Sequence, residues 1–387
     1  MAEGAAAFAD RFAAFEGVAY LDAASQGPLP LAAVRAGREA LGLKERPHRI
    51  GTQTYLSIVA EVRALAARLL GARDESVALV TGAGQVVNAV ARGLDLGEGD
   101  EVVLARHEFP SNDLPWRWLA RRGVKVRFAE PDHATGAVSP GRLAGEIGPR
   151  TRVVAFSHVS YLHGGRIDPG PVVEAARSAG AVTVVDGSQA AGALPFDFGA
   201  SGIDVYAAAG YKFLLGPYGC ALGLFSPAVL NRLAVTDVNW WSVVGSDDLQ
   251  HLPPDVVLKP GAQRYDAHEP ASFNNLMPLA ESLRLLLEAT PALVQAHARS
   301  LGDRVLAALP PGFEPASPLE PAARSHILCL RGAGPKETAL AQERLRAAKV
   351  WTALRGDRIR VSPHLYSTAD DADRLVSALR GGSPRQD

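Results

Sequence analysis

Residues 181–192 read AVTVVDGSQAAG, and this stretch decides the fold class. A short run of β-branched residues ends at Asp186, and small and polar residues follow it. Such a run is typical of a buried parallel strand, whose carboxyl end points into the crevice where open α/β sheets bind ligands. A carboxylate buried there is costly unless a cation or several donors face it. Asp186 is therefore a candidate ligand-binding residue, and a capping Asp at a strand-to-helix turn is the alternative.

The same strand pattern recurs along the first part of the chain. Helical stretches separate short apolar runs, which we expect to be strands at residues 77–80, 101–104, 124–128, 152–156 and 181–185. This alternation predicts a mostly parallel sheet with helices on both faces. A further helix is expected over residues 58–70, with Gly71 in a left-handed cap.

The last third of the chain has a different order of elements. Helix, strand, helix, strand and helix follow one another, and the final helix is expected to begin at Thr368 with Asp371 in its first turn. We predict an α/β protein whose N-terminal arm and large domain span residues 1–275. A smaller α+β domain is expected over residues 276–387.

Composition excludes several classes of function. The 387 residues carry a formal net charge of −1, which gives no electrostatic reason to bind nucleic acid or an anionic membrane. Cys220 and Cys329 are the only cysteines, so a disulfide framework is impossible and a reducing compartment fits. No apolar run is long enough to span a bilayer. We expect a soluble, cytoplasmic protein with no metal site.

A second stretch, DVYAAAGYKFLLGPYG over residues 204–219, contains Lys212 just after a strand-like run. Lysine is rare in this arginine-rich chain, and Lys212 lies in apolar company. Burial favours the neutral amine, which is the form that condenses with an aldehyde. The alternative is a lysine whose stem packs at a strand end while its amine reaches water.

The order Asp186, Gln189, Lys212 resembles the cofactor-binding core of the class V aminotransferase family of fold-type I pyridoxal phosphate (PLP) enzymes. That family includes aminotransferases, cysteine desulfurases, selenocysteine lyases, kynureninases and isopenicillin N epimerase-like enzymes. The resemblance implies PLP as the cofactor and an amino acid as the small-molecule substrate. Asp186 would pair with the pyridine nitrogen, Gln189 would help hold the phenolic oxygen, and Lys212 would form the Schiff base.

The resemblance covers nearly the whole chain. Residues 20–30 resemble the opening segment that lies beside the active site. The sequence TGAGQ over residues 81–85 follows a strand and opens a helix, so the cofactor's phosphate is expected at Ala83, Gly84 and Gln85. Tyr211 stands where the family often has His, and we expect it to help hold the phosphate.

Three further segments resemble parts of the family's site. In HEFPSN over residues 107–112, Phe109 is the candidate for stacking on the PLP ring, with a core Phe as the alternative. In residues 157–165 the family's common Asn is absent, and Ser160 or Tyr161 occupies its region. His158 and His163 lie in the same segment, and structural roles for both remain open.

The C-terminal motif RIRVSPHLYST over residues 358–368 resembles the substrate-carboxylate segment. Arg360 would be the bidentate partner of an amino acid's carboxylate, and a surface arginine is the alternative. The family's sites form at a dimer interface, so a homodimer is expected. Ser272 lies in the stretch that would reach a neighbouring subunit's phosphate.

The type of reaction is predicted from which catalytic groups the sequence contains and which it lacks. The family's desulfurases use a cysteine on a loop that here spans about residues 350–357 and holds none. Cys220 and Cys329 lie in apolar strands, where packing is their expected role. Transamination needs only Lys212 as proton carrier and is the first prediction. A C–S or β-lyase and an amino-acid epimerase are the alternatives. A catalytically silent homologue stands outside the enzyme class, although Asp186, Gln189, Lys212 and Arg360 are all intact.

Overall fold

A computed structural model describes residues 7–132, 135–246, 248, 250–251 and 253–381 of the chain. Its larger sheet has seven strands in the order β2-β8-β7-β6-β5-β3-β4. The strands that the sequence predicts agree with these to within one residue at each end. Their bounds are β2 (Val77–Val80), β3 (Glu101–Ala105), β4 (Lys125–Ala129), β5 (Thr151–Ser157), β6 (Val182–Asp186), β7 (Val205–Ala209) and β8 (Ala221–Phe225).

All neighbouring strands pair in parallel except β8, which is antiparallel to both β2 and β7. The connection from Ala209 at the end of β7 to Ala221 at the start of β8 contains no helix. A parallel return would need a crossover of a dozen or more residues, usually a helix. The chain therefore turns back on itself there, and Lys212 lies in that turn.

Successive residues of each strand belong to two hydrophobic clusters on opposite faces of the sheet. In β6, for example, Val184 packs with one cluster and Val185 with the other. One cluster contains α3 (Thr52–Leu70), α7 (Gly170–Ala179) and α10 (Phe273–Ala289), and the other contains α4 (Ala83–Gly93) and α5 (Pro110–Trp118). Helices on both faces explain why the central strands are largely apolar, whereas the edge strand β4 carries the exposed Lys125. Helix α3 ends at Gly71 with φ 61°, the left-handed cap that the sequence predicts.

The C-terminal part forms a second sheet in the order β12-β13-β10-β9, and all its pairs are antiparallel. Its elements are β9 (Phe313–Pro315), β10 (Leu328–Gly332), β12 (Ala353–Arg355), β13 (Arg358–Val361), α11 (Pro291–Ala307), α12 (Pro335–Ala347) and α13 (Ala369–Leu379). The Thr368 hydroxyl accepts a hydrogen bond from the Asp371 N–H, and the Thr368 N–H donates to the Asp371 carboxylate. This capping box confirms the predicted start of α13.

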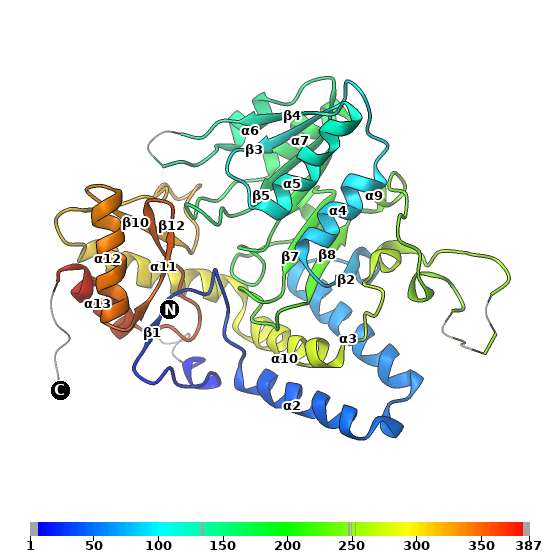
Figure 1. The fold of residues 1–387 in the computed structure, drawn as a ribbon, viewed down its shortest axis with the longest axis horizontal. Helices are drawn as coiled ribbons and strands as arrows, with labels where there is room; N and C mark the ends of the chain where they lie inside the picture. The colour runs from blue at the N-terminus through cyan, green and yellow to red at the C-terminus, as the bar shows by residue number, and fades with distance from the viewer. Residues whose placement is uncertain (1–6, 133–134, 247, 249, 252, 382–387) are drawn as a thin grey trace.

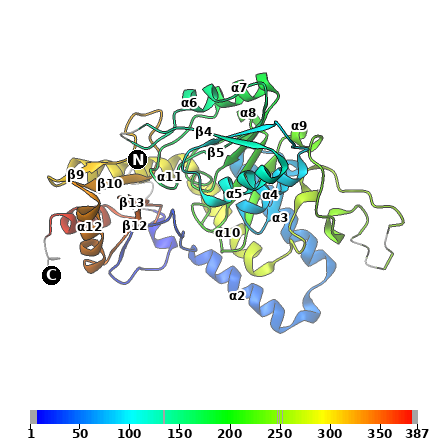
Figure 2. The same cartoon turned by 45° about the horizontal axis from the view of Figure 1, so that its top comes forward.

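The opening segment joins the C-terminal part rather than the large sheet. Strand β1 (Ala19–Tyr20) pairs in parallel with β11 (Val350–Trp351), and Leu21 packs in the C-terminal hydrophobic cluster. Figures 1 and 2 show this blue segment running from the small lobe to α2 (Leu31–Glu45). The sequence did not predict β1, β9, β11 or β12, because strands of two or three residues have no periodicity to detect. The boundary at residue 275 stays a prediction.

The long helices α10 and α11 run from beneath the large sheet to the small lobe (Figure 1). Within the described part of the chain, no helix is both long enough and apolar enough to cross a membrane.

Candidate active site

The site lies where the parallel strands β5, β6 and β7 end together. Ser157, Asp186 and Ala207 are in register across these strands. Asp186 is only 6% exposed, and its Oδ1 accepts a hydrogen bond of 2.8 Å from the Ser188 N–H. The capping role and a ligand-binding role are compatible, because this contact uses one carboxylate oxygen. The other has no hydrogen-bond partner among the described residues.

Lys212 follows β7 and is 7% exposed. Its Nζ lies 5.2 Å from the ring centroid of Phe109 and 5.6 Å from that of Tyr211. No hydrogen bond or ion pair joins this amine to another residue that the structure describes. Burial lowers the pKa of the amine, Asp186 opposes that shift, and the charges of Arg360 and Arg355 reinforce it. A lysine whose amine reaches water does not fit this burial.

The opening segment crosses directly over Lys212. The Gly27 N–H donates a hydrogen bond of 2.8 Å to the Tyr211 carbonyl. A Cβ at Gly27 would lie 2.0 Å from the Lys212 carbonyl oxygen, so only glycine allows this approach. The contact brings Asp22 and Ser25, which precede Gly27, to the same side of the molecule.

The predicted phosphate site is the start of α4, and Gly82 is its N-cap. The N–H groups of Ala83 and Gly84 belong to the first turn, where no acceptor exists within the helix. Gln85 forms hydrogen bonds within the turn itself. Its N–H donates to the Gly82 carbonyl, and its Oε1 accepts from the Thr81 N–H and hydroxyl. A phosphate contact from Gln85 stays a prediction.

Helix α5 begins beside α4. A Cβ at Gly84 would lie 3.3 Å from the Ser111 Cβ, so the first turns of the two helices touch. Phe109 is the N-cap of α5 and turns its ring toward Lys212 and onto the edge of Tyr161, with ring centroids 5.3 Å apart. The structure therefore brings the predicted stacking residue and the predicted phosphate turn to one place.

Gln189 reaches the opening segment. Its Nε2 donates to the Ala24 carbonyl at 3.1 Å, while its Oε1 is buried without a hydrogen-bond partner. A buried amide oxygen left unpaired costs about 1–3 kcal/mol. Such a group marks a place where a ligand can supply the missing bond.

Sequence reasoning missed Glu108, a partly buried residue that follows β3 and contacts Ser157 at the end of β5. Its carboxylate accepts hydrogen bonds from the Ser157 N–H (2.8 Å), the Ser157 hydroxyl (2.5 Å) and Asn112 Nδ2 (2.9 Å). Burial raises the pKa of Glu108 to about 7 despite these donors, and Asp186 contributes in the same direction. His107 has φ 66°, an uncommon value for a residue other than glycine, and this turn directs Glu108 inward. Ser157 lies far away in the sequence, so no local signal reveals the pair.

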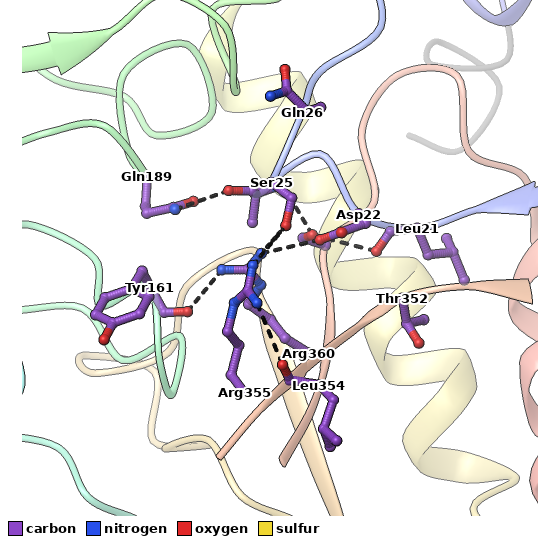
Figure 3. A network of polar contacts seen from close by, with 12 residues as sticks. Leu21, Asp22, Ser25, Gln26, Tyr161, Gln189, Thr352, Leu354, Arg355 and Arg360 are labelled. Carbon is purple, nitrogen blue, oxygen red and sulfur yellow. Dashed lines mark hydrogen bonds and ion pairs between the residues drawn. The ribbon is translucent and has the colours of Figure 1, made fainter. Parts of the chain in front are cut away.

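Arg360 is buried, which contradicts the surface alternative. Its side chain is 1% exposed, and Nη2 donates to Asp22 Oδ1 at 3.1 Å and to Ser25 Oγ at 2.7 Å. Nη1 donates to the Tyr161 carbonyl at 2.9 Å, and Nε has no partner (Figure 3). Arg355 Nη2 also donates to Ser25 Oγ, at 3.1 Å. Asp22, Ser25 and Arg355 were not singled out from the sequence.

The other residues named from the sequence have structural surroundings. His158 Nδ1 lies 3.2 Å from the Tyr206 hydroxyl, and His163 Nδ1 accepts from the Gly165 N–H at 3.0 Å. Burial lowers their pKa values to about 4 and about 3, so both rings are neutral at pH 7. Ser272 is exposed at the N-terminus of α10, and its side chain caps nothing there.

Both thiols are buried, which fits packing roles. Burial raises the pKa of Cys220 to about 12 and that of Cys329 to about 11. Residues 350–357 form the short strands β11 and β12 instead of a long loop. Neither cysteine is therefore a thiolate at neutral pH.

The family model described as Aminotransferase class-V matches residues 19–307. This chain belongs to that family. The chain is 30% identical to an isopenicillin N epimerase of Streptomyces clavuligerus, over 94% of each protein. It is 34% identical to a probable cysteine desulfurase of Methanothermobacter thermautotrophicus, over 57% of this chain and 58% of that protein.

Solved structures of the family share the fold. A cysteine desulfurase of Escherichia coli superposes with a TM-score of 0.83 at 23% identity, covering 97% of this chain and 98% of that one. A cystine C–S lyase with its product cysteine persulfide gives 0.83 at 22% identity, covering 95% and 98%. The predicted fold class, fold type I with a mostly parallel sheet and a separate C-terminal sheet, is confirmed.

Proposed function

We propose that this class-V enzyme, whose cofactor is PLP, is an amino-acid aminotransferase in which Lys212 carries the proton from the substrate's α-carbon to another carbon. The observation that carries the proposal is the Lys212 amine, which is buried beside an aromatic ring and a carboxylate and has no hydrogen-bond partner among the described residues. Burial and the charges of Arg360 and Arg355 lower the pKa of the amine, a shift that favours its neutral form. A neutral amine is both a nucleophile toward an aldehyde and a base toward a C–H bond.

The residues present fit PLP. The Lys212 amine, the second oxygen of Asp186 and Oε1 of Gln189 lack partners that this cofactor offers. Lys212 would hold the aldehyde carbon, Asp186 the ring nitrogen, and Phe109 one face of the ring. The first-turn N–H groups of α4 would hold the phosphate with help from the helix dipole. When bound, PLP stabilises the negative charge left on an amino acid's α-carbon after its proton leaves.

Arg360 and Lys212 would have different roles in the proposed reaction. Arg360 lies across the opening segment from Gln189 and would attract the substrate's carboxylate (Figure 3). Lys212 Nζ would take the α-proton and deliver it to another carbon. Cys220 and Cys329 are excluded as sulfur acceptors, because both are buried thiols. Desulfuration through an enzyme persulfide is therefore not proposed.

Epimerisation is the second candidate. It is favoured by the 30% identity to an isopenicillin N epimerase over 94% of both proteins. The two reactions share removal of the α-proton and differ in the carbon to which the proton returns. The choice therefore depends on which groups face Lys212 once the substrate is bound.

We also propose that the chain forms a homodimer, as the family resemblance implies. Large apolar side chains are exposed on α5 (Leu114, Trp118) and between residues 240 and 257 (Trp240, Val244, Val256, Val257). Exposed large apolar side chains of this kind support the proposal of association with a partner. Sedimentation of the purified protein tests the proposal, and a monomer at all concentrations would contradict it.

An absorbance spectrum with a panel of amino acids tests the function. The protein supplied with PLP should show a visible band that Lys212→Ala lacks and the exposed-lysine control Lys125→Ala keeps. A keto acid formed from one amino acid supports transamination, and the mirror-image amino acid supports epimerisation. Pyruvate or sulfide release would instead identify a lyase. Failure to bind PLP in excess would leave the silent-homologue hypothesis.

A further inference from the structure

We infer that Arg355 is a second substrate-binding arginine of this site. A single carboxylate is bound by Arg355 and Arg360 together, and Asp22 limits the site to one negative charge. This inference rests on the proposed function only in its claim that the carboxylate belongs to an amino acid. The arrangement itself is visible in Figure 3, where two guanidinium groups from neighbouring strands meet at Ser25.

Arg360 alone has no free pair of adjacent N–H donors with which to bind a carboxylate in a bidentate manner. Its Nη2 donates to Asp22 and to Ser25, and one N–H of Nη1 donates to the Tyr161 carbonyl. Both two-donor edges of a guanidinium include Nη2, whose two hydrogens are already used here. The predicted bidentate grip would therefore require Asp22 or Ser25 to be displaced. What remains is one N–H on Nη1 and the buried, unpartnered Nε–H.

Arg355 supplies what Arg360 lacks. It lies at the end of β12, is partly exposed, and donates to Ser25 Oγ at 3.1 Å. Within the described structure, the other hydrogen bond of its guanidinium is a long contact of 3.4 Å to the Leu354 carbonyl. Among the residues the structure describes, no carboxylate forms an ion pair with Arg355. A guanidinium at a site with no counter-ion is available for an anionic ligand.

The charges of the network fix how many carboxylates fit. Arg355 and Arg360 carry two positive charges and Asp22 carries one negative charge, which leaves one positive charge. One substrate carboxylate neutralises it, whereas a second would be buried without a partner. Both arginines also lower the pKa of Lys212, so the network lies within electrostatic reach of that amine.

Calorimetric titration with propionate and with succinate tests the inference in the protein with and without PLP. Arg355→Gln should weaken propionate binding at least about tenfold, since a charge-assisted hydrogen bond is lost. Arg355→Lys should lose less, because it keeps the charge. Asp22→Asn should raise the affinity for succinate relative to propionate, because it adds one net positive charge while keeping an acceptor for Arg360.

The control is Arg346→Gln, which removes the same charge from an exposed position of α12 and should leave both affinities unchanged. Thermal unfolding of each variant establishes that it folds. The inference is overturned if Arg355→Gln binds propionate within about twofold of the wild type. An unchanged succinate-to-propionate ratio in Asp22→Asn overturns the role of Asp22. If the wild-type protein supplied with PLP shows no absorbance band but still binds propionate, the proposed function is rejected and the inference about Arg355 stands.

Discussion

Two polar regions meet at this site, and they differ in how completely their groups are paired. In the crevice at the ends of β5 to β7, the Lys212 amine and Gln189 Oε1 have no hydrogen-bond partner in the described structure. In the arginine network, Asp22, Ser25 and Tyr161 occupy most of the Arg360 guanidinium. We propose that the cofactor adds its bonds in the unpaired crevice. The paired network holds the opening segment against the small lobe and leaves little of Arg360 free.

The largest effect should come from the unpaired crevice. Lys212→Ala removes both the proposed attachment point of the cofactor and the proposed proton carrier, so activity should fall between about a hundredfold and ten-thousandfold. Because Lys212 makes no hydrogen bond or ion pair within the described structure, the thermal stability of the cofactor-free protein should hardly change. A large loss of stability in this variant would mean that the Lys212 side chain stabilises the cofactor-free fold, which contradicts an amine left free for a cofactor.

The next largest effect should come from the paired network, and there it should appear as stability. Arg360→Gln leaves the carboxylate of Asp22 buried without its cation, at a cost of about 3–5 kcal/mol in free energy of unfolding. Urea unfolding measures it, with Arg304→Gln as the comparison, because that arginine pairs with Asp373 in solvent. Combining Arg360→Gln with Asp22→Asn should recover part of the loss. Equal losses in Arg360→Gln and Arg304→Gln would remove the distinction between the two regions.

Glu108 lies in the crevice, but its carboxylate accepts hydrogen bonds from Ser157 and Asn112. The pH dependence that it gives to the unfolding free energy therefore tests how a paired group behaves within the otherwise unpaired crevice. Its pKa is about 7 in the fold against 4.5 for a solvated carboxyl, so between these values the native state holds a proton that the unfolded chain has lost. Unfolding free energy therefore falls as pH rises through this window, by about 3 kcal/mol in total. Glu108→Gln removes the effect, and the Asn112 Oδ1, which has no partner, can accept from the new amide after a turn of the Asn112 side chain.

The measurement is the difference in unfolding free energy between Glu108→Gln and the wild type at pH 5 and at pH 8. The variant should gain on the wild type as pH rises. A difference that does not change with pH would mean that the Ser157 and Asn112 donors keep Glu108 ionised throughout.

The smallest effect should come from the ring that lines the crevice. Phe109→Leu removes the aromatic ring that we propose stacks on PLP, an interaction worth about 1 kcal/mol. PLP affinity should fall several-fold, as measured by titrating the cofactor-free protein. Phe128→Leu is the matched control, since that ring packs under Arg106 on the edge strand β4. Equal effects in both variants would indicate a general packing loss rather than stacking on the cofactor.

The strands of the large sheet could be predicted because each is a short run of β-branched and small apolar residues between helical stretches. Asp186 and Lys212 could be found for the same reason, since each follows such a run directly. The antiparallel direction of β8 and the two- or three-residue strands of the small lobe could not be predicted, because strand direction and such short pairings depend on partners distant in sequence. Glu108 escaped notice because its role depends on Ser157, which lies on the neighbouring strand β5 and 49 positions away in sequence.

The sequence by itself determined the order of elements, the family and the chemical groups of the crevice, because those depend on neighbours along the chain. Only the tertiary structure decided that Asp22 and Ser25 meet Arg360, across 338 and 335 positions of sequence, and that Arg355 joins them. It also decided that the Arg360 donors are largely used within the protein. Hydrogen bonds are directional and short, so which groups remain free for a ligand is known only when every neighbour has been placed.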